Sequence, residues 1–160
     1  MTDTRRPHVA RLTVRGYHCD AYGHVNNARW LELFEEARWR LLEGGGALAR
    51  LHDAGYGFVV VRIEVDYRRP AVPEDVLEIR SRLDHVGGRS AVIRQQAVRV
   101  GRVGETGSGD QGVGDTARER LLAEAAVTFV VVERATGRPA ALAGEVREAL
   151  AATMPNDDDR

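Results

Sequence analysis

One stretch with the period of an α-helix stands alone in this chain and limits the folds that it can adopt. In residues 28–42, apolar side chains recur at spacings of three and four, namely Trp30, Leu31, Phe34, Ala37, Leu41 and Leu42. Charged side chains fill most of the opposite face, namely Glu32, Glu35, Glu36, Arg38 and Arg40. Three glycines at 44–46 predict where the helix stops. The sequence therefore predicts one helix of about four turns over residues 27–43, and no second long one.

After this helix the apolar pattern changes to period two, which is typical of strands. Residues 58–69, 75–86, 89–100 and 121–133 alternate in this way, and Gly87-Gly88 predicts a tight hairpin turn. In the first of these runs, we expect one face to hold Val59, Val61, Ile63, Val65 and Tyr67.

Weaker patterns predict the remaining elements. Residues 8–15 read as a first strand, residues 47–53 and 144–153 as short helices, and residues 138–143 as a short extended piece. One long helix with several antiparallel strands predicts an α+β domain in which a curved sheet wraps around the central helix.

The length of 160 residues favours a single domain. Residues 1–7 and 155–160 read as polar tails, and the glycine-rich residues 101–120 as a flexible surface loop between two strands. A single helix covers only part of one face of such a sheet. We therefore expect a second copy to bury the remaining surface, in a homodimer.

Composition excludes several classes of function. The formal net charge of -1 gives no bulk attraction to nucleic acid. A single cysteine rules out an intrachain disulfide and a multi-cysteine zinc site. Neither a metal-ligand spacing nor a phosphate-binding or dinucleotide-binding motif is present. No apolar run approaches the ~20 residues that span a bilayer, and residues 1–12 lack the apolar core of a signal peptide. We expect a cytoplasmic protein without metal, cofactor or membrane insertion.

A polar turn, residues 16–27, leads into the helix and holds the candidate catalytic groups. Asp20 could act as a general base or as a nucleophile on an acyl carbon, or could serve only as an Asx-turn or helix cap. His24 could orient a carbonyl or share a proton, or could be a structural histidine. His18 reads as structural or exposed. Cys19 is an alternative nucleophile, although such a cysteine is often a small buried apolar residue.

The helix start itself could bind an oxyanion. Asn26 or Asn27 is a natural N-cap. The backbone N–H groups of Val25, Asn26 and Asn27 precede the first intrahelical donor. Together with the helix dipole, they could polarise a carbonyl oxygen. The same helix start could be capped by an asparagine side chain and bind an oxyanion through its backbone N–H groups.

Several arginines could bind the phosphates of a coenzyme, namely Arg62, Arg68, Arg69, Arg89 and Arg94. The stretch Gly87-Gly88-Arg89-Ser90 is the sharpest candidate, since two glycines allow a close backbone approach. The alternative is a hairpin turn with an exposed arginine.

At this point the residues resemble a known family. HCDAYGHVNNARWLELFEEARW, residues 18–39, resembles the signature of the hotdog-fold acyl-CoA thioesterases of the 4-hydroxybenzoyl-CoA thioesterase superfamily. With FVVVRIEVDYRRPAV at 58–72 and AEAAVTFVVVERATGRPAALAGEVREAL at 123–150, the chain is similar to the bacterial long-chain acyl-CoA thioesterase III group, which is associated with fatty-acid β-oxidation. The similarity spans residues 12–150, and the loop at 101–120 is longer here than in the group.

The resemblance implies a hotdog fold and an activity. Two subunits would pair their sheets in a homodimer, and dimers would assemble further into a homotetramer. The reaction would be hydrolysis of an acyl-CoA thioester to a free acid and CoA, without metal or organic cofactor.

The resemblance also assigns residues in the polar turn. Asp20 falls on the catalytic carboxylate of the D-x-x-G pattern. The backbone N–H groups of Val25, Asn26 and Asn27 fall on the helix start that polarises the thioester carbonyl. His24 and Asn27 match an H-V-N-N variant of the motif.

Further residues are expected to bind substrate. Tyr22 stands where the D-x-N-x-H version of plant acyl-carrier-protein thioesterases has Asn. Arg89 and Ser90 fall in a turn and strand that contact CoA in such dimers, and the partner subunit would supply them. The acyl chain is expected to lie along the helix at the dimer interface, against Trp30, Leu31 and Phe34.

The sequence thus predicts an acyl-CoA thioesterase for medium- to long-chain substrates. One alternative keeps the fold but hydrates or dehydrates enoyl-thioesters, and its usual His-plus-acid pattern is not found here. Another alternative is a non-catalytic acyl-CoA-binding module, which would not need Asp20.

Overall fold

Five strands and three α-helices make up the part of the chain that the computed structural model describes, residues 6–44, 46–105 and 120–152. In chain order they are β1 (His8–Thr13), the 3-10 turn η1 (Gly16–His18), α1 (Asn27–Gly44), α2 (Ala47–Asp53), β2 (Tyr56–Tyr67), β3 (Asp75–Val86), β4 (Ser90–Arg102), β5 (Arg120–Glu133) and α3 (Gly144–Ala151). The predicted helices and strands are confirmed with small shifts of their ends, whereas η1 was not predicted. The extended piece predicted at 138–143 is not a strand and holds only an isolated bridge between Pro139 and Val132. No helix in the described ranges is long and apolar enough to cross a membrane.

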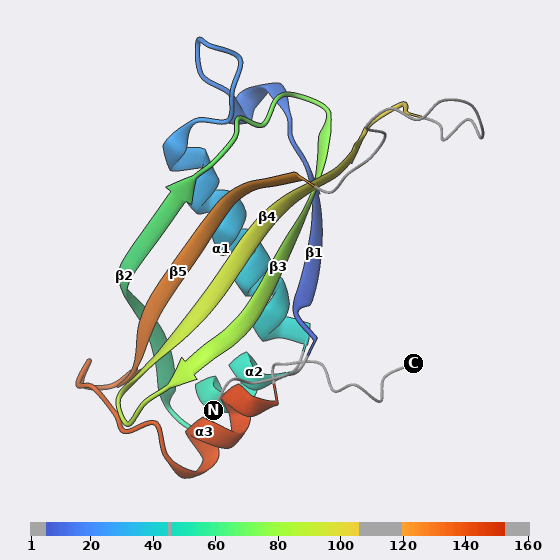
Figure 1. Ribbon diagram of the computed structural model, residues 1–160. Coiled ribbons are helices and arrows are strands. Elements are labelled where there is room, and N and C mark those ends of the chain that lie inside the picture. The colour runs from blue at the N-terminus through green and yellow to red at the C-terminus, as the bar shows by residue number, and fades with distance from the viewer. Residues whose placement is uncertain (1–5, 45, 106–119, 153–160) are drawn as a thin grey trace.

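The strands form one antiparallel sheet in the order β1-β3-β4-β5-β2. In Figure 1, α1 runs behind the sheet along one face, while α2 and α3 lie together near the end of α1. The predicted arrangement of a sheet around one long helix is confirmed.

Two of the predicted irregular segments fall mostly outside the described residues. β4 continues to Arg102 and β5 begins at Arg120, so the predicted loop at 101–120 is shorter at both ends than expected. The tails at 1–5 and 155–160, like residues 106–119 of the loop, lie outside the described ranges.

β2 carries a bulge that the period-two pattern does not reveal. Val60 pairs with Phe129 and Ile63 pairs with Val127, with a register shift between them. Because directly paired residues project from the same face of a sheet, Val60 lies on the helix side with Ile63, whereas Val59 does not. The predicted face for this strand is therefore wrong in its first half.

The buried face of α1 is rotated relative to the prediction. Its buried side chains are Trp30, Leu33, Phe34, Ala37, Arg38, Leu41 and Leu42. Leu31, which the pattern places on the apolar face, is 37% exposed, whereas Leu33 is 6% exposed. Arg38 was predicted on the polar face, and that prediction is wrong because the side chain is only 8% exposed.

A buried hydrogen-bond network accounts for the position of Arg38. Arg38 Nη1 donates to Gln95 Oε1 at 2.9 Å. Gln95 Nε2 donates to the Phe34 carbonyl at 3.0 Å and to Ser81 Oγ at 2.9 Å. Burial lowers the pKa of Arg38, and the Glu35 carboxylate opposes this effect. The network ties α1 to β3 and β4 and provides an acceptor for a cation that would otherwise be buried without one.

We predict that replacing Gln95 by leucine lowers the free energy of unfolding by about 2–4 kcal/mol, because the buried Arg38 loses its acceptor. Urea denaturation monitored by circular dichroism measures this change. The matched control is Gln96→Leu, since the neighbouring Gln96 is exposed and donates to Glu124 on the other face of the sheet. The control should change stability by no more than about 0.5 kcal/mol. Equal losses in the two variants would contradict the role of this network.

Candidate active site

The polar turn before α1 is a tight loop closed by backbone hydrogen bonds. Cys19 and Val25 form an isolated antiparallel bridge. Within it, the Asp20 N–H donates to the His24 carbonyl at 2.9 Å, and the Gly23 N–H donates to the Asp20 carbonyl at 3.0 Å. Gly23 has a φ of 74°, a left-handed conformation that glycine adopts without steric cost. The sequence therefore presents Asp20 and His24 on one small rigid loop.

Asp20 is exposed and partly engaged. The Tyr22 N–H donates to Asp20 Oδ1 at 2.9 Å, which is the Asx-turn that the sequence left open. Its other carboxylate oxygen makes no hydrogen bond within the described residues, so it can meet a substrate or a water molecule. His24 is also exposed, and Tyr22 is 86% exposed at the loop tip.

Two of the three amides predicted to bind an oxyanion are already used within the subunit. The Val25 N–H donates to the Ala71 carbonyl at 2.9 Å. The Asn26 N–H donates to the His18 carbonyl at 3.0 Å. These bonds hold the polar turn against η1 and against the loop that leaves β2. Neither N–H can bind an oxyanion without breaking its existing bond.

The amide of Asn27 differs from these two. Asn26 is the N-cap, because its Oδ1 accepts from the Ala28 N–H at 2.8 Å and its carbonyl accepts the first helical bond from Trp30 at 3.1 Å. The Asn27 N–H has no acceptor among the described residues. The Asn27 carbonyl accepts a hydrogen bond from the Tyr67 hydroxyl at 3.1 Å. Tyr67, at the end of β2, was not among the predicted site residues, although its hydroxyl contacts the start of α1.

His18 and Cys19 have structural environments. His18 Nδ1 accepts a hydrogen bond from the Arg15 N–H at 2.9 Å. Burial, followed by the charge of Arg29, lowers the pKa of His18 and favours the neutral ring. Burial, followed by the Asp20 carboxylate, raises the pKa of the Cys19 thiol and so disfavours the reactive thiolate.

The side chains expected to contact an acyl chain differ in burial. Trp30 and Phe34 are 3% and 1% exposed, with ring centroids 6.0 Å apart, and both belong to the core. Leu31 is 37% exposed. An acyl chain could therefore contact Leu31 directly, whereas contact with Trp30 or Phe34 would require the core to open.

Arg89 and Ser90 lie far from Asp20 in the same subunit. Arg89 lies in the turn between β3 and β4, and Ser90 is the first residue of β4. In this turn the Gly88 carbonyl accepts from the Leu142 N–H at 2.9 Å, close to α3. In Figure 1 this turn and the polar turn are at opposite ends of the sheet. One subunit alone does not bring Arg89 and Ser90 to the site.

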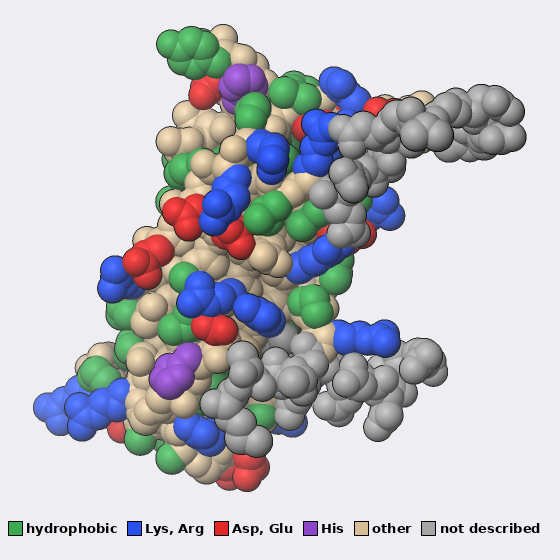
Figure 2. Space-filling view, viewed as in Figure 1, with side chains coloured by type: hydrophobic (Ala, Val, Ile, Leu, Met, Phe, Trp, Pro, Cys, Tyr) green, Lys and Arg blue, Asp and Glu red, His purple; other side chains and the backbone are tan. Residues whose placement is uncertain are grey.

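The other arginines considered for phosphate binding are engaged elsewhere. Ion pairs with carboxylates hold three of them, namely Arg62 with Glu64 at 2.8 Å, Arg68 with Glu124 at 2.6 Å and Arg94 with Asp84 at 2.7 Å. Arg69 Nη1 donates to the Leu121 carbonyl at 3.2 Å. These contacts make the arginines part of a charged sheet surface, which Figure 2 shows on the face away from α1.

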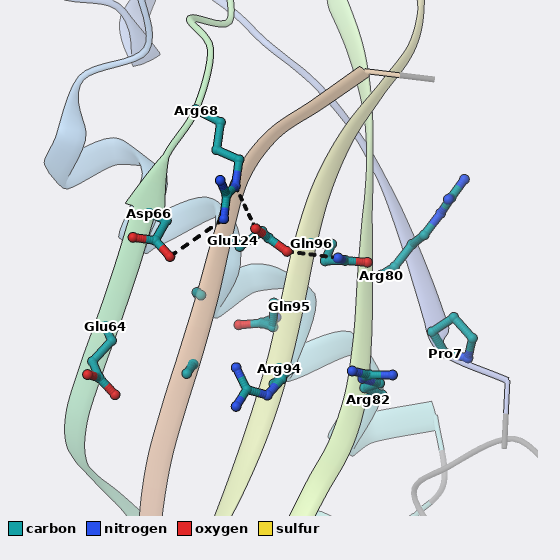
Figure 3. A pocket seen from close by; sticks show the side chains of 12 residues that line it. Pro7, Glu64, Asp66, Arg68, Arg80, Arg82, Arg94, Gln95, Gln96 and Glu124 are labelled. Atoms are coloured by element: carbon teal, nitrogen blue, oxygen red, sulfur yellow. Dashed lines mark hydrogen bonds and ion pairs between the residues drawn. The ribbon is translucent and has the colours of Figure 1, made fainter. Parts of the chain in front are cut away.

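That surface also holds a groove of about 590 Å³. Figure 3 shows Glu124 between Arg68 and Gln96, and hydrogen bonds from Gln96 and Arg68 lower the pKa of Glu124. Glu64 and Asp66 lie on the β2 side of the groove, and Arg80, Arg82 and Arg94 lie on its β3 and β4 side, so acidic and basic groups face each other across it. Because the groove is on the sheet face opposite α1, it is separate from the polar turn.

Comparison with known proteins assigns the chain to a family. Residues 14–150 match the family described as the Thioesterase-like superfamily, and the chain belongs to it. The predicted family and the predicted hotdog fold are confirmed.

Particular relatives are similar over most of their length. The long-chain acyl-CoA thioesterase FadM of Escherichia coli K12 is 39% identical over 140 residues, which cover 88% of this chain and 94% of FadM. The crystal structure of YbaW, a probable thioesterase from Escherichia coli, has 37% identity and a TM-score of 0.78, covering 92% of this chain and 98% of that one. A 4-hydroxybenzoyl CoA thioesterase in complex with 4-hydroxybenzoyl CoA shares the fold, with a TM-score of 0.73 at 15% identity over 90% of this chain and 98% of that one.

Proposed function

We propose that this protein hydrolyses acyl-CoA thioesters to a carboxylic acid and CoA. Membership of the thioesterase-like superfamily supports the reaction, and the similarity to FadM supports medium- to long-chain fatty acyl groups as substrates. The observation that carries the proposal is that the Asn27 N–H, directly after the loop that holds Asp20, has no acceptor within residues 6–44, 46–105 and 120–152.

The chemistry follows from these two groups. The thioester carbonyl oxygen accepts a hydrogen bond from the Asn27 N–H, at the positive end of the α1 dipole. As general base, Asp20 takes a proton from a water molecule that attacks the carbonyl carbon; as nucleophile, it attacks that carbon itself, and water then hydrolyses the acyl-aspartyl anhydride. The developing oxyanion is stabilised at Asn27 while the carbon–sulfur bond breaks and the CoA thiolate leaves. The Val25 and Asn26 amides hold the loop in place for this step.

The side chains around the turn shape the pocket. His24 and Tyr22 are exposed on the loop and contact the CoA side of the substrate. Leu31 contacts the acyl chain, with Trp30 and Phe34 as the rigid core behind it. This arrangement assigns substrate binding to exposed groups and support to buried ones.

A homodimer completes the site in this proposal. β2 is at one end of the sheet, and apolar side chains along it are exposed, namely Val59 at 44%, Val60 at 43%, Val61 at 56%, Ile63 at 37% and Tyr67 at 46%. An exposed apolar edge strand favours pairing with another strand, and a second copy paired antiparallel about a two-fold axis covers it. The two-fold axis reverses the direction of the second subunit, so Arg89 and Ser90 of one subunit lie at the same end of the joined sheet as Asp20 of the other. A further pairing of dimers and a cytoplasmic location stay predictions from the sequence.

We predict that Asp20→Asn lowers kcat for acyl-CoA hydrolysis by about 100-fold or more, because the variant loses the carboxylate that promotes attack. Asparagine keeps the oxygen that accepts from the Tyr22 N–H, so the loop should be preserved. Release of free CoA from a panel of acyl-CoAs of increasing chain length measures the effect, together with the melting temperature.

The matched control is Asp66→Asn, which removes an exposed carboxylate on the outer sheet face. Turnover of Asp20→Asn at the wild-type rate would remove Asp20 from the mechanism. Hydration of crotonyl-CoA without release of CoA would assign the wild type to the enoyl-thioester hydratases, and tight acyl-CoA binding without turnover would make it a binding module.

We also predict that Val61→Glu converts a wild-type dimer into a monomer, because it inserts a charge into the proposed β2 seam. Sedimentation velocity at micromolar concentration measures the mass. Val103→Glu is the control, since Val103 is 49% exposed and follows β4 at a distance from β2. A wild-type monomer, or a Val61→Glu dimer, would contradict this interface.

A further inference from the structure

The hydroxyl of Tyr67 makes a contact that the proposed mechanism leaves unused. Its donor bond to the Asn27 carbonyl joins the end of β2 to the first turn of α1. We propose that Tyr67 is a positioning residue for hydrolysis, which fixes the first turn of α1 so that the Asn27 N–H faces the thioester carbonyl. This inference rests on the proposed function and names the group that aligns its oxyanion donor.

The hydrogen bonds around Asn27 show why one hydroxyl can set this alignment. The peptide group before Asn27 is held by its carbonyl, which accepts from Trp30. The peptide group after Asn27 is held by its carbonyl, which accepts from the Tyr67 hydroxyl in addition to the helical backbone bond of the first turn of α1. Both peptide planes are therefore restrained from the carbonyl side, and the Asn27 N–H is the group that stays available.

A helix start needs such a restraint. The N–H groups of the first turn have no intrahelical acceptor, and helix ends fray. In the described part of the chain, the contact from Tyr67 is the side-chain hydrogen bond that reaches this turn from the sheet. If a hydrogen-bond donor is displaced by about 1 Å from the developing negative charge, the reaction rate can fall by about 100-fold.

The strand that carries Tyr67 is itself firmly placed. Tyr67 pairs with Ala123 of β5. Directly after it, the Arg68 and Arg69 N–H groups both donate to the Leu122 carbonyl, at 2.8 and 3.0 Å. The hydroxyl therefore extends from a fixed backbone, and β5 determines where the helix start lies.

Tyr67 also lies on the proposed dimer seam. Its side chain is 46% exposed in the single subunit, at the edge strand that a second copy would cover. Pairing of two β2 strands would further restrain Tyr67. The same strand would then join two subunits and align the oxyanion donor.

The test is Tyr67→Phe, which removes one oxygen and keeps the ring. We expect about a tenfold decrease in kcat for acyl-CoA hydrolysis, with KM within about twofold of wild type and an unchanged melting temperature, because substrate still binds but the oxyanion is stabilised less well. The matched control is Tyr56→Phe on the same strand, since the Tyr56 hydroxyl makes no hydrogen bond within the described ranges. The control should keep the wild-type kcat.

Each other outcome has a defined meaning. Wild-type kcat in Tyr67→Phe would overturn the inference, as would an equal decrease in Tyr56→Phe. A raised KM with unchanged kcat would also overturn it, because Tyr67 would then contribute equally to binding of the substrate and of the transition state. If the wild type itself releases no CoA from any acyl-CoA of the panel, the proposed function fails, and the inference fails with it.

Discussion

The backbone hydrogen bond from the Val25 N–H to the Ala71 carbonyl joins the two segments on which this site depends. One segment is the polar turn that carries Asp20, and the other is the loop that leaves β2. Because Val25 is 5% exposed and Ala71 is fully buried, water does not compete for this bond. It fixes one end of the turn against the sheet, while the Asn26 cap and the Tyr67 contact fix the start of α1.

This arrangement divides the three amides of the helix start between two tasks. Val25 and Asn26 each have an acceptor inside the subunit, so their N–H groups stabilise the loop. Asn27 is the first residue of α1, and its N–H has no acceptor in the part of the chain that the structure describes, so it is available to a ligand. A site of this kind needs few side chains, since backbone donors and the helix dipole supply the polarising field. Asp20, on the loop that precedes this donor, then supplies the carboxylate.

Much of the fold could be predicted because its signals are local. The period of residues 28–42 and the glycines after it specify α1, and Gly87-Gly88 specifies the β3–β4 turn. The bulge in β2 could not be predicted, because it depends on how Val60 pairs with Phe129 of β5. Arg38 was misplaced for a similar reason, since its acceptor Gln95 lies on a strand 57 residues away.

The same division applies to the site. Asp20 and the Asn26 cap are readable from a short motif. The hydrogen-bond partners that distinguish one amide from another cannot be read from the motif, because they lie far away in sequence. The Val25 N–H donates to the Ala71 carbonyl, and the Asn27 carbonyl accepts from Tyr67, which is 40 residues distant in sequence. Sequence patterns therefore located the turn but did not select the donor within it.

In the proposed reaction Asn27, and not Val25 or Asn26, donates to the substrate carbonyl. Amide NMR of the wild-type protein with an acyl-CoA analogue whose thioester sulfur is replaced by CH₂ tests this directly, since the carbonyl is kept and cannot be hydrolysed. We expect a large downfield shift of the Asn27 amide proton on binding, with the Val25 and Asn26 amide protons changing much less. An unchanged Asn27 resonance in the bound protein, or equal shifts of all three, would contradict it.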